Sequence, residues 1–493
     1  MGVYRFWHYK RFSRRIFLAL LFCLVAKKIS ATEKVNTTKC EWCWIGAVTD
    51  RSITIKAKLN NKITPRNYIQ VFYAQNSDLS LGNKELEKVA AASFSNQIAT
   101  FDLIDLLEDT TYYYVIIADG RRYPSQGTLK FKTVKINQPY SFAIACSSCA
   151  GGTISQFSNL GVSNSKVFDL IRNYKYQKED GQDSNLDLFV HMGDLHYRND
   201  LPVIGLKENY LDDYQYNYHL VMTQKRQKDL YQNIPLAYVW DDHDYGTNDS
   251  DGSYNLKYIA SKAYREQVPH YSLVETLEDK RQGAIYQSFT IGRVRFIMTD
   301  SRFYQDPTDA VDNNNKTLLG QNQREWLFQQ LKIAKQRQID NQEGLTVWVN
   351  SIPWIAKQNS AIGSWNKFSH ERNKIANFIK ENQIDKLIMI SGDAHMLAID
   401  DGTGETANSY ATGGGGSFPV IQAASLDSRP SFKGDTYNGE KYIINSKVKS
   451  KNGAIPGKGQ WGVLKFIDNG EKIELKVELK RMKETLIQHD FIF

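Results

Sequence analysis

The sequence predicts an α/β domain that follows a smaller all-β domain, and two patterns along the chain support this. From about Thr32 to Lys135, apolar residues alternate with period two in short segments, as in an antiparallel sandwich. After Gln138, apolar strands instead alternate with segments of helical spacing, as in α/β domains. The chain has 493 residues, of which 41% are hydrophobic, so it is long and apolar enough for two packed domains. We expect a leading segment at 1–31 and domains at 32–137 and 138–493.

The first 31 residues have the pattern of an export signal. A basic stretch that contains Arg14-Arg15 precedes an apolar run from Ile16 to Ala26, which is too short to span a bilayer. Ser13–Leu18 is similar to the bacterial twin-arginine signal, whose cargo crosses the membrane folded. An ordinary secretory signal is the alternative. We expect a mature protein that begins near Thr32, contacts export machinery only transiently, and resides in the periplasm, the cell envelope or the medium.

The net charge does not indicate a nucleic-acid-binding protein. The chain has 62 Lys+Arg against 54 Asp+Glu, a formal charge of +8. Seven of the basic residues lie in the first 31 positions, where no acidic residue occurs, so removing this segment leaves a charge of +1. We therefore expect no stable nucleic-acid partner. The sequence does not predict an oligomeric state.

The front domain is predicted from short alternating strands. They lie at Ile53–Leu59, Tyr68–Ala74, Tyr112–Ala118 and Thr128–Val134. The segment Leu107–Tyr114 resembles the corner of a fibronectin-III-like domain, in which a tyrosine packs back on a turn. No cluster of ionisable residues occurs in this region, so we interpret the domain as a support or adhesion module.

Four cysteines beyond the export signal form two CxxC pairs. Cys40 and Cys43 precede Cys146 and Cys149 by about a hundred residues, which is too far for the usual spacing of a zinc ribbon. Each pair therefore needs its own explanation. Cys40 and Cys43 form a small disulfide or remain thiols, and the sequence leaves both open.

The second domain is predicted from strands that alternate with helices. The expected strands are Ser141–Cys146, Leu186–Met192, Leu236–Trp240, Val294–Met298, Thr346–Val349, Leu387–Ile390, Trp461–Phe466 and Ile473–Leu479. Helices are expected around Val167–Ile171, from Trp326 to Ala334 and from Ile375 to Ile379. Chemistry in such sheets usually lies just beyond the carboxyl ends of the strands.

Polar segments follow four of these strands. They are Ser147–Cys149, Gly193–Tyr197, Asp241–Asp244 and Gly392–His395. One such segment could be a helix cap or a turn, but four in one domain indicate a shared site.

The residue types in these segments favour a site for two metal ions. Asp194 can bridge two cations, while Cys149, Tyr197 and His395 offer a thiolate, a phenolate and an imidazole. Asp242 and Asp393 add carboxylates for a second cation. Two neighbouring cations clamp a phosphoryl group and lower the pKa of water, which phosphoester hydrolysis requires.

At these residues the chain resembles the calcineurin-like metallophosphoesterases and, within them, the alkaline phosphatase D (PhoD-like) family. Gly193–Tyr197 is similar to the GDxxY motif, and Trp240–Gly252 is similar to the longer WDDHDYGxND segment. Further segments match in order: IACSSCA before Cys149, TDSR (Thr299–Arg302), SIPW (Ser351–Trp354), SGDAH (Ser391–His395) and GGGGSFPV (Gly413–Val420). The resemblance covers nearly the whole chain. It implies a metallophosphatase sandwich of two β-sheets flanked by helices, behind a fibronectin-III-like domain.

The resemblance also implies the metal ions. Fe³⁺ would be held by Cys149, Asp194, Tyr197 and His395, and Asp194 would bridge to Ca²⁺ held also by Asp242 and Asp393. Asn and His usually occupy the last two places in the superfamily, and their replacement by carboxylates fits an oxygen-preferring ion. The alternatives are Zn²⁺, Mn²⁺ or Mg²⁺ in a dinuclear site. The histidine expected before the proline of the fourth motif is absent, because Asn350-Ser351-Ile352 stand there.

The remaining site residues follow from the same motifs. His243 would act with Asp194 in catalysis, as an acid or a hydrogen-bond donor to the leaving oxygen. Arg302 and Asn248 are candidate substrate-binding residues, although Arg302 could instead pair with Asp300 and brace a loop.

We therefore expect an exported phosphohydrolase of alkaline phosphatase D type. It would hydrolyse phosphomonoesters, phosphodiesters or both, with a metal-activated hydroxide at a dinuclear site. One alternative is a phosphodiesterase or a phospholipase-D-like enzyme with the same site. The other is a non-catalytic exported binding protein with a structural metal site.

Overall fold

The structure is a computed structural model, and it describes most of the chain beyond the N-terminal segment. The described residues are 38–62, 68–79, 88–91, 93–151, 161–178, 181–197, 210–275, 283–355, 363–403, 408–430 and 455–493. The predicted export signal at 1–31 lies outside them. Among the described residues, none of the helices has the length and apolar character needed to cross a membrane.

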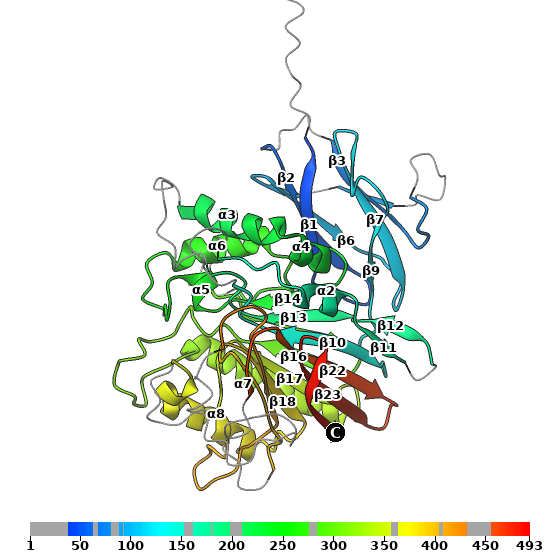
Figure 1. Cartoon of the computed structure of the whole chain (residues 1–493). Coiled ribbons are helices and arrows are strands. Elements are labelled where there is room, and N and C mark those ends of the chain that lie inside the picture. The colour runs from blue at the N-terminus through cyan, green and yellow to red at the C-terminus, as the bar shows by residue number, and fades with distance from the viewer. Residues whose placement is uncertain are drawn as a thin grey trace, which may run out of the picture.

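Two large β-sheets form the centre of the molecule (Figure 1). The first sheet has the strand order β24 (Glu484–Ile492), β23 (Ile473–Arg481), β22 (Gln460–Asp468), β10 (Phe142–Ser147), β13 (Leu188–Met192), β14 (Leu236–Val239), β1 (Cys40–Gly46), β2 (Ile53–Leu59), β6 (Ile98–Leu103) and β5 (Ser93–Ser95). The second has the order β15 (Gln287–Ile291), β16 (Val294–Met298), β17 (Leu345–Asn350), β18 (Leu387–Ser391), β20 (Val420–Ala423), β19 (Met396–Asp400) and β21 (Ile455–Pro456). The predicted fold class, two sheets flanked by helices, is confirmed.

Helices cover the two sheets from opposite sides (Figure 1). On one side lie α3 (Tyr210–Thr223), α4 (Lys225–Tyr231) and α6 (Lys257–Gln267), with α2 (Val167–Arg172) and the short α5 (Asp242–Tyr245) nearby. On the other side lie α7 (Gly320–Ile339) and α8 (Ser369–Glu381), which follows the 3₁₀ turn η2 (Trp365–Phe368). The sequence analysis did not predict α3, α4, α6, β15, β19, β20 or β24.

Aromatic side chains fill the space between the two sheets. Phe142 of β10 stacks on Phe466 of β22 with ring centroids 4.7 Å apart, and Phe296 of β16 meets Phe466 edge-on at 6.2 Å. All three side chains are buried. Each aromatic pair contributes about 0.5–1.5 kcal/mol beyond the burial of its apolar area. This packing holds the two sheets together.

The front region combines part of the first sheet with a separate sheet. The separate sheet contains β4 (Lys88–Ala91), β3 (Ile69–Ala74), β7 (Thr111–Ala118), β8 (Arg121–Tyr123) and β9 (Leu129–Lys132). The four strands predicted for this region correspond to β2, β3, β7 and β9, and each predicted end lies within two residues of the end in the structure. The Leu107 N–H donates to Tyr112 Oη at 2.9 Å, so a tyrosine does pack back on this turn as expected. A small ribbon of β11 (Lys175–Gln177) and β12 (Asp183–Asn185) lies beside this region (Figure 1).

Strand β1 joins the front region directly to the larger domain. Gly46 pairs in parallel with Leu236 of β14, and a β-carbon at Gly46 would lie 2.5 Å from the Leu236 carbonyl oxygen. Only glycine allows this approach. The boundary at 137 stays a prediction, since one sheet runs through both regions.

The four cysteines Cys40, Cys43, Cys146 and Cys149 are all buried, free thiols in the structure. Burial raises the pKa of Cys43 and of Cys146 to about 12, which keeps both thiols protonated. Of the two alternatives for Cys40 and Cys43, this structure contains the free thiols, and it contains no disulfide between Cys146 and Cys149 either.

Candidate metal centre

The ends of parallel strands from both sheets meet at one place. Cys149 follows β10, Asp194 follows β13, Asp242 follows β14 and Asp393 follows β18. The backbone is left-handed at Cys149 (φ 58°), Asp194 (φ 56°), Asp393 (φ 61°) and His395 (φ 50°). Non-glycine residues rarely adopt this conformation, and they do so mainly at functional sites. The strands thus end in sharp turns that direct polar side chains toward each other.

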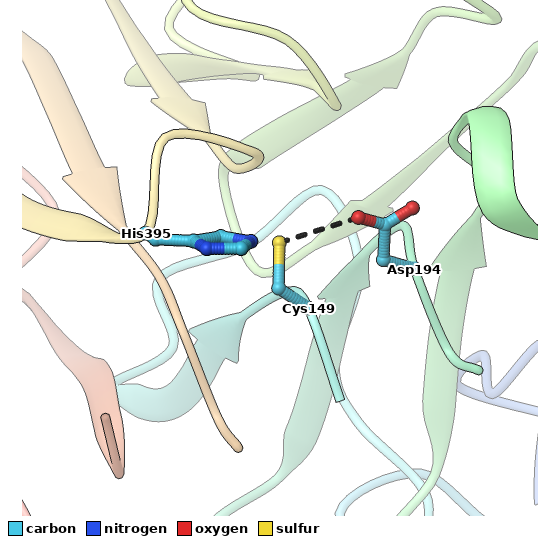
Figure 2. A group of neighbouring side chains, drawn as sticks. All are labelled: Cys149, Asp194 and His395. Carbon is cyan, nitrogen blue, oxygen red and sulfur yellow. Dashed lines mark hydrogen bonds between the residues drawn. The ribbon is translucent and has the colours of Figure 1, made fainter. Parts of the chain in front are cut away.

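Cys149, Asp194 and His395 form the first group of potential ligands (Figure 2). One donor atom of each lies within 4.8 Å of the other two. Cys149 Sγ is 3.5 Å from Asp194 Oδ2, and Tyr197 Oη donates to the same oxygen at 2.7 Å. Tyr197 Oη is also 3.1 Å from His395 Nε2. The predicted thiol, carboxylate, phenol and imidazole therefore surround a common point.

A backbone carbonyl fixes the orientation of the His395 ring. His395 Nδ1 lies 2.7 Å from the Arg429 carbonyl oxygen, which can only accept a hydrogen bond. A proton therefore resides on Nδ1, and Nε2 is turned toward the group formed by Cys149, Asp194 and Tyr197. Metal-binding histidines are commonly oriented in this way.

Two further groups share Asp194. In one, donor atoms of Asp194, Asp242 and His243 lie within 4.8 Å of one another, and in the other, those of Asp194, Asp241 and Asp393 do so. Asp194 Oδ1 and Asp241 Oδ2 are buried and accept no hydrogen bond. Asp194 is thus placed to bridge two cations.

Burial makes these carboxylates difficult to ionise in the absence of cations. It raises the pKa of Asp194 well above its usual range, and repulsion from Asp242, Asp241, Asp244 and Asp393 adds to the effect. Burial also raises the pKa of Asp241 to about 7, although the neighbouring guanidinium of Arg302 acts in the opposite direction. Bound cations reverse such shifts. The donor set and its unpaired oxygens therefore fit two cations.

His243 lies in α5, directly after Asp242. Its side chain is buried, and its ring lies over the Tyr197 ring with centroids 4.0 Å apart. Asp244, which the sequence analysis did not assign, accepts the Leu195 N–H at 2.8 Å and the Asp241 N–H at 3.1 Å. Asp244 thus ties this helix to the loop that carries Asp194 and Tyr197.

The two candidate substrate-binding residues lie in different surroundings. Arg302 is buried, and its Nε donates to Asp241 Oδ1 at 2.6 Å while Nη2 lies 3.6 Å from Asp242 Oδ1. The alternative in which this guanidinium pairs with Asp300 is wrong, because Asp300 instead accepts the Arg302 backbone N–H. Asn248 is exposed and donates to Asp249 Oδ2 at 2.6 Å.

Serines brace the cysteine side of the site. Ser148 Oγ accepts the Asp393 N–H at 3.1 Å and lies 3.2 Å from Cys149 Sγ. Ser428 Oγ donates to the Cys149 carbonyl at 3.0 Å. A β-carbon at Gly392 would lie 2.6 Å from Ser148 Oγ, so glycine is needed there. No motif in the sequence pointed to these contacts, which depend on the three-dimensional fold.

Comparison with known proteins identifies similar chains. The profile of the family described as PhoD-like phosphatase matches residues 162–456. Alkaline phosphatase D of Bacillus subtilis (strain 168) is 25% identical over 249 residues, which cover 43% of this chain and 41% of that protein. The chain thus spans about two fifths of the length of this relative.

Two solved structures share the fold. The structure of PhoD superposes with a TM-score of 0.62 at 15% identity, covering 92% of this chain and 89% of that one. The purple acid phosphatase PPD1 from yellow lupin (Lupinus luteus) seeds superposes with a TM-score of 0.56 at 13% identity, covering 93% and 74%.

Proposed function

This chain belongs to the PhoD-like phosphatase family, and we propose that it is a metal-dependent hydrolase of phosphate esters. The observation that carries the proposal is the position of Asp194. Its carboxylate belongs to three groups of potential ligands, and its buried Oδ1 accepts no hydrogen bond. A carboxylate shared in this way suits two cations that act together on a phosphoryl group.

The first cation would be held by a strongly anionic set of donors. Cys149, Asp194, Tyr197 and His395 would supply it, and Tyr197 would bind as a phenolate. Burial raises the pKa of Tyr197 well above its usual value, so a strongly Lewis-acidic ion is needed to remove its proton. We therefore propose Fe³⁺ at this position.

The second cation would be held by carboxylates. Asp194, Asp242 and Asp393 offer oxygen donors, which favours Ca²⁺. Zn²⁺, Mn²⁺ and Mg²⁺ are the alternatives at either position. When bound, the two cations neutralise the phosphoryl charge and lower the pKa of water.

The residues of the chain would then position the ester and supply a hydrogen bond or a proton to the leaving oxygen. His243 is beside the proposed ligands Asp242 and Tyr197, where it can donate a hydrogen bond to the leaving oxygen. The Nδ1–H of His395 donates to the Arg429 carbonyl, so His395 is not the group that would donate a proton to the leaving oxygen. Export through a twin-arginine signal, which would deliver the protein folded, is part of the same proposal.

A panel of esters with a matched pair of variants tests the proposal. The metal-loaded protein should hydrolyse p-nitrophenyl phosphate, bis(p-nitrophenyl) phosphate or both, and their ratio will show whether monoesters or diesters are preferred. Asp194→Asn should lose both metal and turnover. Asp187→Asn serves as the control, because Asp187 is also buried but interacts with Tyr176 and the Ala143 N–H, outside all three groups.

The panel also separates the alternatives. Hydrolysis of diesters alone would favour a phosphodiesterase, and release of the head group from a phospholipid would favour a phospholipase-D-like enzyme. Stable metal binding without turnover of any ester would contradict the proposal and favour a binding protein.

A further inference from the structure

The carboxylate of Asp241 lies beside those of Asp194 and Asp393, and the proposed function has given it no role. We infer that Asp241 is a further ligand of this cation, held in position by Arg302 and Ser351. The inference rests on the proposed two-cation site and extends it by one residue. Its support comes from hydrogen bonding, packing and charge.

The two oxygens of Asp241 have different surroundings. Oδ1 accepts hydrogen bonds from Arg302 Nε at 2.6 Å and from Ser351 Oγ at 3.0 Å. Oδ2 is buried and accepts none. A carboxylate oxygen of Asp241 lies within 4.8 Å of donor oxygens of both Asp194 and Asp393. The partners on Oδ1 therefore fix the carboxylate and leave Oδ2 for a cation.

A simple ion pair does not explain this arrangement. An arginine that only neutralised Asp241 could bind both of its oxygens side by side. Arg302 instead spans two carboxylates, since Nε contacts Asp241 and Nη2 lies 3.6 Å from Asp242 Oδ1. The single positive charge of Arg302 cannot balance the four carboxylates of Asp194, Asp241, Asp242 and Asp393, and a bound cation would offset much of the remaining negative charge.

The packing brings Asp241 close to Asp194. A β-carbon at Gly193 would lie only 2.4 Å from Asp241 Cβ, so the glycine before Asp194 is what permits this approach. Strand β17 of the second sheet ends at Asn350 and is followed by Ser351, whose hydroxyl donates to Asp241. Ca²⁺ takes six to eight oxygen ligands, so a further carboxylate can be accommodated.

Asp241→Asn tests the inference, because the amide retains an oxygen acceptor for Arg302 and Ser351 but loses the anionic Oδ2. The metal-stripped protein is first reloaded with iron, whose content is measured, and is then titrated with Ca²⁺; the dissociation constant of Ca²⁺ is obtained by calorimetry and from the Ca²⁺-dependent rise in melting temperature. We expect this variant to keep the first cation but to bind the second about 100-fold more weakly. Asp187→Asn, the buried control outside the site, should bind both cations as the wild type does.

Ser351→Ala provides a second variant that leaves the carboxylate in place, should Asp241→Asn fail to fold. Loss of the hydrogen bond to Asp241 Oδ1 should weaken the binding of the second cation about 10-fold. If Asp241→Asn folds and binds the second cation as tightly as the wild type, the inference is overturned while the proposed function stands. If only Ser351→Ala folds, an unchanged affinity of that variant for the second cation has the same consequence. A wild-type protein that takes up only one cation would overturn both.

Discussion

Gly193→Ala should lower activity through a steric clash, although it removes no proposed ligand. Gly193 has φ +94°, and an added β-carbon would lie 2.4 Å from Asp241 Cβ and 2.9 Å from the Asp241 backbone nitrogen. Ordinary contacts begin near 3.4 Å, so the two strand ends must separate by about 1 Å. A displacement of about 1 Å in an active site can cost about 100-fold in rate. The strained φ should also cost about 1–3 kcal/mol of stability.

Gly470→Ala is the matched control for backbone strain. Gly470 has φ +91°, but its nearest contact would be Pro139 Cγ at 3.5 Å, which is an ordinary distance. Gly470→Ala should therefore lose only the stability that the strained φ costs, measured as the free energy of unfolding, and Gly193→Ala should lose at least as much. Only Gly193→Ala should lose about 100-fold in kcat/KM on a chromogenic phosphate ester and bind the second cation more weakly. Equal kcat/KM values in the two variants would refute the steric reasoning.

Three other predictions address the roles of individual residues. His243→Ala should lose about 100-fold or more in turnover while retaining both cations, whereas Asp242→Ala should lose the second cation and activity together. If His243→Ala also lost metal, His243 would have to be a metal ligand. Tyr197→Phe should remove visible charge-transfer absorption and activity, and a colourless, fully active protein that contains only Zn²⁺ or Mg²⁺ would exclude iron. Replacing Arg14 and Arg15 with Lys should block export but not activity, and normal secretion would contradict the twin-arginine hypothesis.

Much of the site could be predicted because strand ends are visible in the sequence. The apolar runs before Cys149, Asp194, Asp242 and Asp393 correspond to β10, β13, β14 and β18. Parallel strands place their carboxyl ends at one edge, so residues that are far apart in the chain can be expected to meet. This rule accounts for the meeting of Cys149, Asp194 and Asp242 at the edge of the first sheet, whereas the approach of Asp393 depends on how the second sheet packs against it.

Other features could not be predicted, for identifiable physical reasons. Strand β1 is buried on both faces along most of its length, so it lacks the alternation that reveals a half-buried strand. The sequence suggested Asp300 as the partner of Arg302, since the two are close along the chain. In the fold, the guanidinium instead reaches Asp241, which is 61 positions away. Contacts between residues so far apart in the chain leave no periodic pattern in the sequence from which they could be predicted.

The most direct test of the account is to titrate the metal-stripped protein with cations while the initial rate of ester hydrolysis is measured. The stripped protein should be inactive, because no cation then neutralises the phosphoryl charge or lowers the pKa of water. Activity should return as metal is added and should level off at two equivalents per chain, one on each side of the shared carboxylate of Asp194. Full activity in the stripped protein, or a plateau at one equivalent, would contradict the two-cation mechanism.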